Sequence, residues 1–178
     1  MKDIIFNMFN DIIVTRFDER ARKEMLENAR VSGAHSTFGN YADHDMLALV
    51  SAASHQLTMT PRACLQWLGQ EILPRPGRNY PGMLERFSTI FSMLKALNNV
   101  IHAEVIRFHP DAIGSVFHYH EVSSHSMVME YCSARGICSL AHGLMRGCSN
   151  HFNEAVEIDH QECRHRDDEH CLFHITIR

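Results

Sequence analysis

The spacing of apolar residues changes at Pro110, and this change limits the folds open to the chain. Before Pro110, apolar side chains recur every three or four residues, as on one face of an amphipathic helix. After it, residues 116–122 and 126–132 alternate apolar and polar side chains and are joined by a short polar turn, which is typical of an antiparallel hairpin. A helical first half followed by a strand-rich second half predicts an α+β fold.

The individual elements follow from the same periodicities. Asp43 is a candidate N-cap, and Thr60 followed by Pro61 is typical of a helix start. We expect helices at residues 3–16, 17–29, 41–57, 61–74, 83–91, 92–108 and 137–152, and two further strands at 155–160 and 172–177. No internal repeat, low-complexity tract or long linker divides the 178 residues, so a single domain is expected.

Charge and hydropathy exclude two classes of partner. The formal net charge of -4 argues against nucleic acid. No apolar stretch approaches the roughly 20 residues that a membrane-spanning helix needs, so we expect a cytoplasmic protein that does not enter a membrane. The fourteen His and six Cys instead direct attention to metal-ligand chemistry.

Tyr131, Ser133 and Arg135 recur at every second position, so in an extended segment their side chains share one face. Two hydroxyl donors beside a guanidinium can grip carboxylates, and the paired propionates of haem are one candidate ligand. The alternative is an ordinary strand end with solvent-facing polar residues.

His102 lies on or beside the apolar side of the predicted helix 92–108. An imidazole in apolar surroundings can ligate haem iron, which needs a proximal ligand and apolar walls. A buried histidine without a ligand role is the alternative reading. Other histidines that could serve instead are His109, His118, His120 and His125.

A second group of metal-ligand residues lies near the C-terminus. His160 and Cys163 form an H-x2-C unit, Cys171 follows across a polar turn, and Cys138 begins the preceding helix. Three thiolates and one imidazole suit a tetrahedral zinc site, and free thiols on a reduced protein are the alternative. His165 and His170 could replace His160, whereas Cys64, Cys132 and Cys148 show no partner pattern and are expected to be buried or boundary thiols.

The chain resembles the H-NOX (haem nitric oxide/oxygen binding) domain family. The similarity rests on MKDIIFN at residues 1–7, NVIH at 99–102 followed by FHPDA at 108–112, and Tyr131-x-Ser133-x-Arg135, and it spans essentially the whole chain. It implies one domain over residues 1–178, in which a helical part (about 1–65) packs on a part with the ligand helix and a four-stranded antiparallel sheet (about 66–178), with haem b between them.

The same resemblance implies roles for the candidate residues. His102 is similar to the proximal haem ligand, and Tyr131, Ser133 and Arg135 are similar to the propionate clamp. A subset of the family also carries a zinc site, whose ligands match Cys138, His160, Cys163 and Cys171. The chain departs from the family pattern near Ile113-Gly114, where many members have a proline that presses on the porphyrin.

The resemblance also bears on which gas is bound. Members that hold oxygen stably carry a tyrosine on the helix after the clamp, and this chain has Leu140 at that place. Phe9 and Leu144 are expected to complete an apolar distal pocket, which favours nitric oxide because this gas binds ferrous haem strongly without a hydrogen-bond donor. His142 is the one residue nearby that could donate if it faced the pocket.

We therefore predict a non-enzymatic nitric oxide sensor. By the resemblance, nitric oxide releases His102 from the iron, and the changed surface signals to a separate histidine kinase or to a cyclic-di-GMP enzyme, a diguanylate cyclase or phosphodiesterase. An enzyme is disfavoured because the carboxylates and His170 of the 167–170 stretch lie on a turn without a nucleophile. The alternative is a zinc/thiol redox sensor that acts through Cys138, Cys163 and Cys171.

Overall fold

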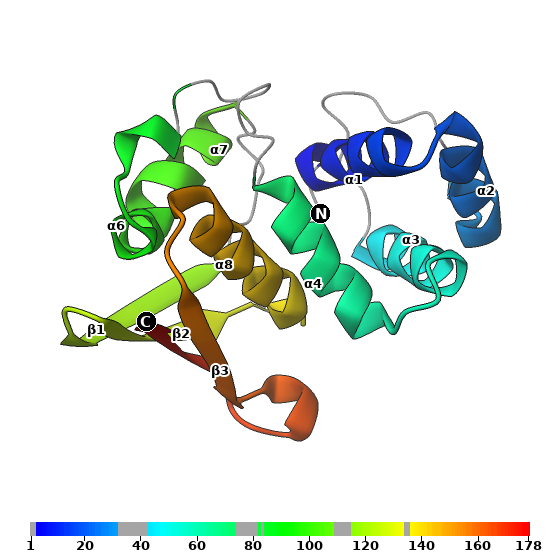
Figure 1. Cartoon of the computed structure of the whole chain (residues 1–178). Helices are drawn as coiled ribbons and strands as arrows, with labels where there is room; N and C mark the ends of the chain where they lie inside the picture. Colours follow the sequence, from blue (N-terminus) through cyan, green and yellow to red (C-terminus); the bar gives the residue numbers. More distant parts are fainter. Residues whose placement is uncertain (1–2, 32–42, 74–81, 83, 109–114, 134–135) are drawn as a thin grey trace.

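The computed structural model describes residues 3–31, 43–73, 82, 84–108, 115–133 and 136–178. Four helices come first: α1 (Asp3–Arg16), α2 (Glu19–Ala29), α3 (Asp43–Gln56) and α4 (Pro61–Ile72). The start of α4 is as predicted, with Pro61 in the first turn and the Thr60 hydroxyl accepting from the Ala63 N–H at 3.2 Å. Figure 1 shows α1, α2 and α3 grouped on one side of α4.

The predicted helices at 83–91 and 92–108 are divided differently in the structure. They become a 3-10 turn η1 (Leu84–Arg86), helix α6 (Ile90–Lys95), a π-helical turn η2 (Leu97–Ile101) and helix α7 (His102–Phe108). The new start is fixed by a capping box, since Thr89 accepts from Ser92 N–H and Ser92 Oγ accepts from Thr89 N–H. The predicted boundary at residues 91 and 92 is therefore wrong.

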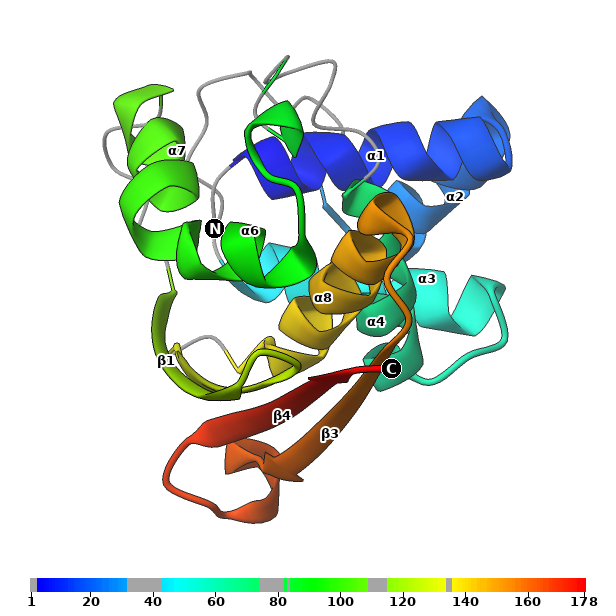
Figure 2. The same ribbon diagram turned by 60° about the vertical axis from the view of Figure 1, so that its left-hand side comes forward.

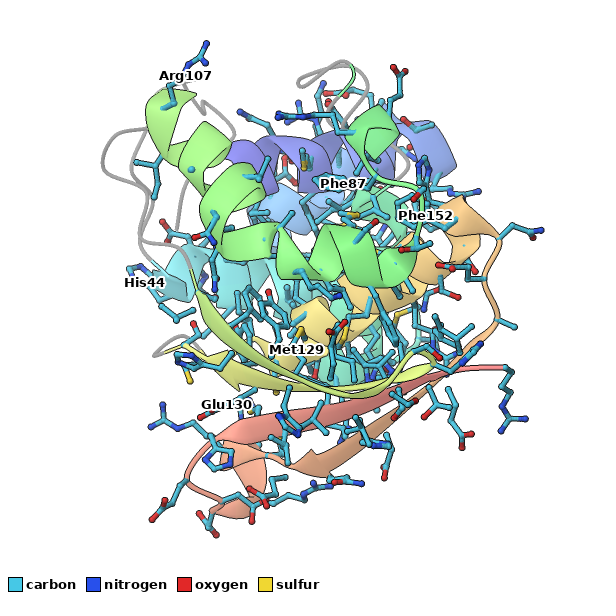
Figure 3. All side chains as sticks on the ribbon, turned by 90° about the vertical axis from the view of Figure 1, so that its left-hand side faces the viewer. His44, Phe87, Arg107, Met129, Glu130 and Phe152 are labelled. Carbon is cyan, nitrogen blue, oxygen red and sulfur yellow. The ribbon has the colours of Figure 1, made fainter. Side chains whose placement is uncertain are left out.

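Strands β1 (Val116–Ser123), β2 (Ser126–Cys132), β3 (Val156–Glu162) and β4 (Cys171–Ile177) form an antiparallel sheet in the order β1-β2-β4-β3. Its inner face is apolar, with Met127, Met129 and Phe173 buried. Figure 3 shows Met129 on the helix side of the sheet and Glu130 on the opposite side, as the two-residue period of a strand requires. The predicted α+β fold with a four-stranded antiparallel sheet is confirmed.

Helix α8 (Cys138–Phe152) connects the two halves, because it lies between α4 and the inner face of the sheet (Figures 1 and 2). Its backbone approaches α4 closely at glycines: a Cβ on Gly143 would lie 2.1 Å from the Gln66 carbonyl oxygen, and one on Gly69 of α4 would lie 2.5 Å from the Leu140 carbonyl oxygen. Only residues without a side chain allow this approach.

Among the described residues, no helix combines the length and the apolar character that a bilayer crossing requires. The expected division into parts at about residue 65 stays a prediction.

Candidate functional site

His102 is the first residue of α7 and packs its ring against β1. Its ring centroid lies 5.6 Å from that of Phe117. Burial lowers the pKa of the half-buried imidazole, and a hydrogen bond to the backbone of Ser115 opposes this shift. A neutral imidazole is the form that ligates a metal, so His102 is suited to this role at neutral pH.

Tyr131 reaches the same region from β2. Its side chain is buried, its ring centroid lies 5.5 Å from that of Phe117, and its hydroxyl accepts a 3.3 Å hydrogen bond from Ser115 Oγ. Burial raises the pKa of Tyr131, although hydrogen bonds to Ser115 and Ser133 oppose the rise. Ser115 thus contacts His102 through its backbone and Tyr131 through its side chain, which brings two of the predicted haem contacts together.

Asn98 fixes the turn that precedes His102, and the sequence reasoning missed it. Its Nδ2 donates to the Phe117 carbonyl oxygen at 2.7 Å, and the Phe117 N–H donates to Asn98 Oδ1 at 3.2 Å. These two bonds clamp η2 to β1 one turn before His102. Sequence offered no signal for this pairing, because nineteen positions separate the two residues.

Ser133 is half-buried and interacts with Tyr131. Arg135, the third member of the predicted clamp, lies outside the described residues, as do His109, Ile113 and Gly114. Of the other histidines that could have replaced His102, the three that the structure describes, His118, His120 and His125, are all exposed.

The predicted distal residues are apolar and mostly buried: Phe9 is 1% exposed, Leu140 is 4% exposed, and Leu144 packs partly buried against the core. His142 lies between Leu140 and Leu144 on α8, and its side chain points about 200° around the helix axis from each of theirs. Its Nδ1 is 3.4 Å from Gln66 Nε2, and its ring meets Phe173 edge-on at 6.0 Å. His142 therefore contacts α4 and the sheet on the other side of α8 from Leu140 and Leu144.

The four predicted zinc ligands converge. One ligand atom each from Cys138, His160, Cys163 and Cys171 lie within 4.8 Å of one another, and the Sγ atoms of Cys138 and Cys163 are 3.7 Å apart. Two thiolates on one tetrahedral zinc, each with a Zn–S bond of about 2.3 Å, would stand about 3.8 Å apart. The three cysteines are buried, and the thiol pKa of Cys138 is raised to about 12, chiefly by burial.

His160 offers the clearest sign that a ligand is expected in this cluster. Its Nε2 is buried and has no hydrogen-bond partner among the described residues, while its ring stacks on Phe173 at 4.1 Å. Burial lowers the pKa of His160 to about 4, so the ring is neutral at pH 7. Three thiols and one neutral imidazole with an unsatisfied nitrogen fit a structural zinc ion.

The two spare histidines have other contacts. His165 Nε2 lies 2.6 Å from the Gly136 carbonyl oxygen, and His170 Nε2 lies 2.9 Å from Glu162 Oε2. Neither belongs to the cluster, so His160 is the histidine that the structure places beside the three cysteines. Cys64 and Cys148 are buried thiols, as expected, and Cys132 is half-buried at the end of β2.

Comparison with known families decides the wider assignment, because the sequence profile described as Haem-NO-binding matches residues 2–160. The chain belongs to the Haem-NO-binding (H-NOX) family. It is thus a haem-based gas-binding domain, as the resemblance implied. Comparison by sequence with curated proteins finds no match.

Solved H-NOX structures share the whole fold. The H-NOX protein from S. oneidensis in the Fe(II)NO ligation state superimposes with a TM-score of 0.91 at 23% identity, over 100% of this chain and 99% of that one. The unliganded Fe(II) H-NOX protein from K. algicida gives a TM-score of 0.87 at 27% identity, over 100% and 97% of the two chains. These likenesses show that the chain has the H-NOX fold over its whole length.

Proposed function

We propose that this H-NOX domain senses nitric oxide at a ferrous haem held by His102, with Tyr131, Ser133 and Arg135 on the propionates. The observation that carries the proposal is the meeting of His102 and Tyr131 at Ser115. Haem needs an imidazole for its iron and polar partners for its propionates, and α7 offers the first while β2 offers the second beside the same serine.

The described surroundings fit this prosthetic group. Haem, when bound, would supply a ferrous iron that binds the gas, and His102 would hold that iron. Phe117 would flank the imidazole, and Asn98 would hold the turn before it at a constant distance from β1. Release of His102 would then free α7 to move relative to β1, while η2 stays attached through Asn98.

The preference for nitric oxide rests on Phe9, Leu140 and Leu144. None of these side chains can donate a hydrogen bond to oxygen, and the ring of His142 contacts Gln66 and Phe173 instead. An apolar site gives bound oxygen little stabilisation, whereas nitric oxide needs none. The movement of α7 would signal to a separate effector, a histidine kinase or a cyclic-di-GMP enzyme, provided that the effector binds the two states with different affinity.

The direct test of the haem ligand is the ferrous absorption spectrum of His102→Ala beside that of His125→Ala. We expect His102→Ala to lose the haem Soret band and to regain it when free imidazole is supplied, because imidazole can occupy the vacated position. His125 is exposed and serves as the matched control. Full haem retention in His102→Ala without imidazole would refute the assignment.

A second candidate function has its own observation. The buried Sγ atoms of Cys138 and Cys163 are 3.7 Å apart, so two-electron oxidation could join them. In that reaction a peroxide is reduced to water while two thiols lose two electrons and two protons, and a zinc ion held there would lose two of its four ligands. Zinc release together with a Cys138–Cys163 disulfide on peroxide treatment, both reversed by a dithiol reductant, would support a redox sensor; zinc retention by oxidised protein would exclude it.

A further inference from the structure

The outer face of the sheet carries a group of metal-ligand side chains that the haem and Cys3His sites do not use. His118 on β1 is the Cα partner of Glu130 on β2, and Cys132 follows Glu130 by two residues, so all three side chains point away from the helices. Figure 3 shows Glu130 on this outer side. One ligand atom from each of the three residues lies within 4.8 Å of the other two.

We propose that His118, Glu130 and Cys132 form a second metal site, for a first-row divalent cation such as zinc. The three residues offer an imidazole nitrogen, a carboxylate oxygen and a thiolate sulfur, a mixed donor set that suits zinc or copper rather than magnesium or calcium. Three protein ligands leave a fourth position open to solvent, unlike the four ligands of the Cys3His cluster.

Two of the three donors are already in contact, and the third lies within 4.8 Å of them. Cys132 Sγ donates to Glu130 Oε1 at 3.5 Å, and the side chain of Glu130 is about one third exposed, so the carboxylate is held near the thiol. A cation would take the place of the thiol proton between these two atoms. The bound metal would then join the edge strand β1 to β2 on either side of Tyr131.

His170 and Glu162 lie next to the proposed ligand Glu130 and affect the charge of the site. His170 Nδ1 lies 3.8 Å from Glu130 Oε1, and its Nε2 lies 2.9 Å from Glu162 Oε2. His170 therefore lies between the proposed ligand carboxylate of Glu130 and the carboxylate of Glu162, a place from which an outer partner can orient a metal ligand. The carboxylates of Glu130 and Glu162 favour a cation at this corner of the sheet, and the positive charge of Arg164, which acts on the Cys132 thiol, opposes it in part.

The inner and outer sites share no residue, and the sheet separates them. Cys171 and His160 belong to the inner face, whereas His118 and Cys132 belong to the outer one. The outer site is also independent of the haem, so its test can fail while the gas-sensing proposal stands.

The experiment is a zinc titration of the haem-loaded full chain, in competition with a chromophoric chelator, after the first zinc equivalent has been bound. We expect a second zinc per chain in native mass spectra. Cys132→Ser combined with Glu130→Gln should abolish the second zinc and keep the first. His118→Ala should weaken it at least about tenfold, since even outer partners of a metal contribute that much.

Two outward-facing histidines of the same sheet provide matched controls. His120→Ala and His174→Ala remove imidazoles outside the group and should leave the second zinc unchanged. Cobalt added after zinc has filled the Cys3His site should give a thiolate charge-transfer band that Cys132→Ser removes. Absence of a second zinc at about a hundredfold excess of the metal would overturn the proposal. Retention of that zinc by the Cys132→Ser, Glu130→Gln protein would overturn it equally.

Discussion

The predicted zinc ligands and the predicted haem ligands differ in how far the polypeptide alone assembles them. The four zinc ligands come from α8, β3, β4 and the turn between the strands, yet their ligand atoms already lie within 4.8 Å of one another. His102 and Tyr131 instead bond to Ser115, which lies between them. A zinc ion would meet four donors that already lie close together, whereas the predicted haem contacts His102 and Tyr131 are linked to each other through Ser115.

The zinc cluster and the predicted haem site nevertheless share the sheet and helix α8. Tyr131 is the Cα partner of Cys171 in the β2–β4 pairing, so a predicted clamp residue and a predicted zinc ligand lie side by side on the sheet. On α8, Cys138 belongs to the cluster and Leu140 follows two residues later. A change in the packing of α8 should therefore affect both sites, whereas a change confined to one group of ligands should leave the other site assembled.

The largest expected effect is loss of the zinc ion. Cys163→Ala with Cys171→Ala should remove about one zinc per chain and lower the unfolding temperature by roughly 10 °C, as loss of a ligand present at a thousandfold its Kd would do. Haem binding through His102 should persist. Metal analysis and thermal unfolding measure both, with Cys64→Ala as a control that removes a buried thiol outside the cluster.

If that double variant keeps its full zinc content, these cysteines are not the ligands. If it loses haem as completely as His102→Ala does, the two sites are not separately assembled and the comparison fails.

Substitution of the contact glycines should weaken both sites together, since α8 carries residues of each. Gly143→Ala should destabilise the protein by about 3 kcal/mol, because its Cβ would meet the Gln66 carbonyl oxygen at 2.1 Å. Gly69→Ala, at 2.5 Å from a backbone oxygen, and Gly147→Ala, at 2.9 Å from Leu73 Cβ, should cost progressively less. Chemical denaturation gives the order, and equal costs for the three variants would contradict it.

The next largest effect on stability is expected from a substitution near His102 alone. Asn98→Ala leaves the Phe117 N–H and carbonyl oxygen without their partner, at a cost of about 2 kcal/mol. It should loosen η2 and reduce haem retention while the zinc content stays constant. The neighbouring exposed Asn99→Ala is the control. Normal haem retention in Asn98→Ala would show that the position of His102 does not depend on this clamp.

The smallest effect is on pH dependence in the haem-free, metal-free protein. Burial lowers the pKa values of His102, His142 and His160 below the ordinary 6.5, that of His160 to about 4. The unfolded chain therefore binds more protons between these values, and stability that is complete above about pH 6.5 is lost as pH falls towards 4. His160→Asn should flatten this slope relative to exposed His151→Asn; a slope unchanged by His160→Asn would contradict the assignment.

The zinc cluster shows what the sequence could predict. The donor types and the H-x2-C unit identified all four residues, because metal chemistry restricts the possible ligands. The family resemblance named His160 rather than His165 or His170, and the fold agrees, since the hairpin sends the His160 ring towards Phe173 and the His170 ring towards Glu162. Residue types indicate the candidate group, and the direction of the backbone brings its four side chains together.

Contacts between distant segments account for what the sequence could not show. Asn98 and Phe117 pair across two elements, and Ser115 joins His102 to Tyr131, without any local pattern that marks them. The same limit applies to Cys132, which lacked a partner in sequence but stands near His118 across the β1–β2 pairing. The change from α to π geometry at Leu97 was likewise hidden, because apolar spacing remains helical through it.

The central claim is that His102 binds haem in an apolar site that favours nitric oxide over oxygen. The absorption spectrum of the ferrous protein, recorded first in air and then with nitric oxide, tests it most directly. The account predicts a haem Soret band without a stable oxygen complex in air, followed by a clear shift when nitric oxide is added. A stable oxygen complex in air, or a spectrum that nitric oxide leaves unchanged, would contradict it.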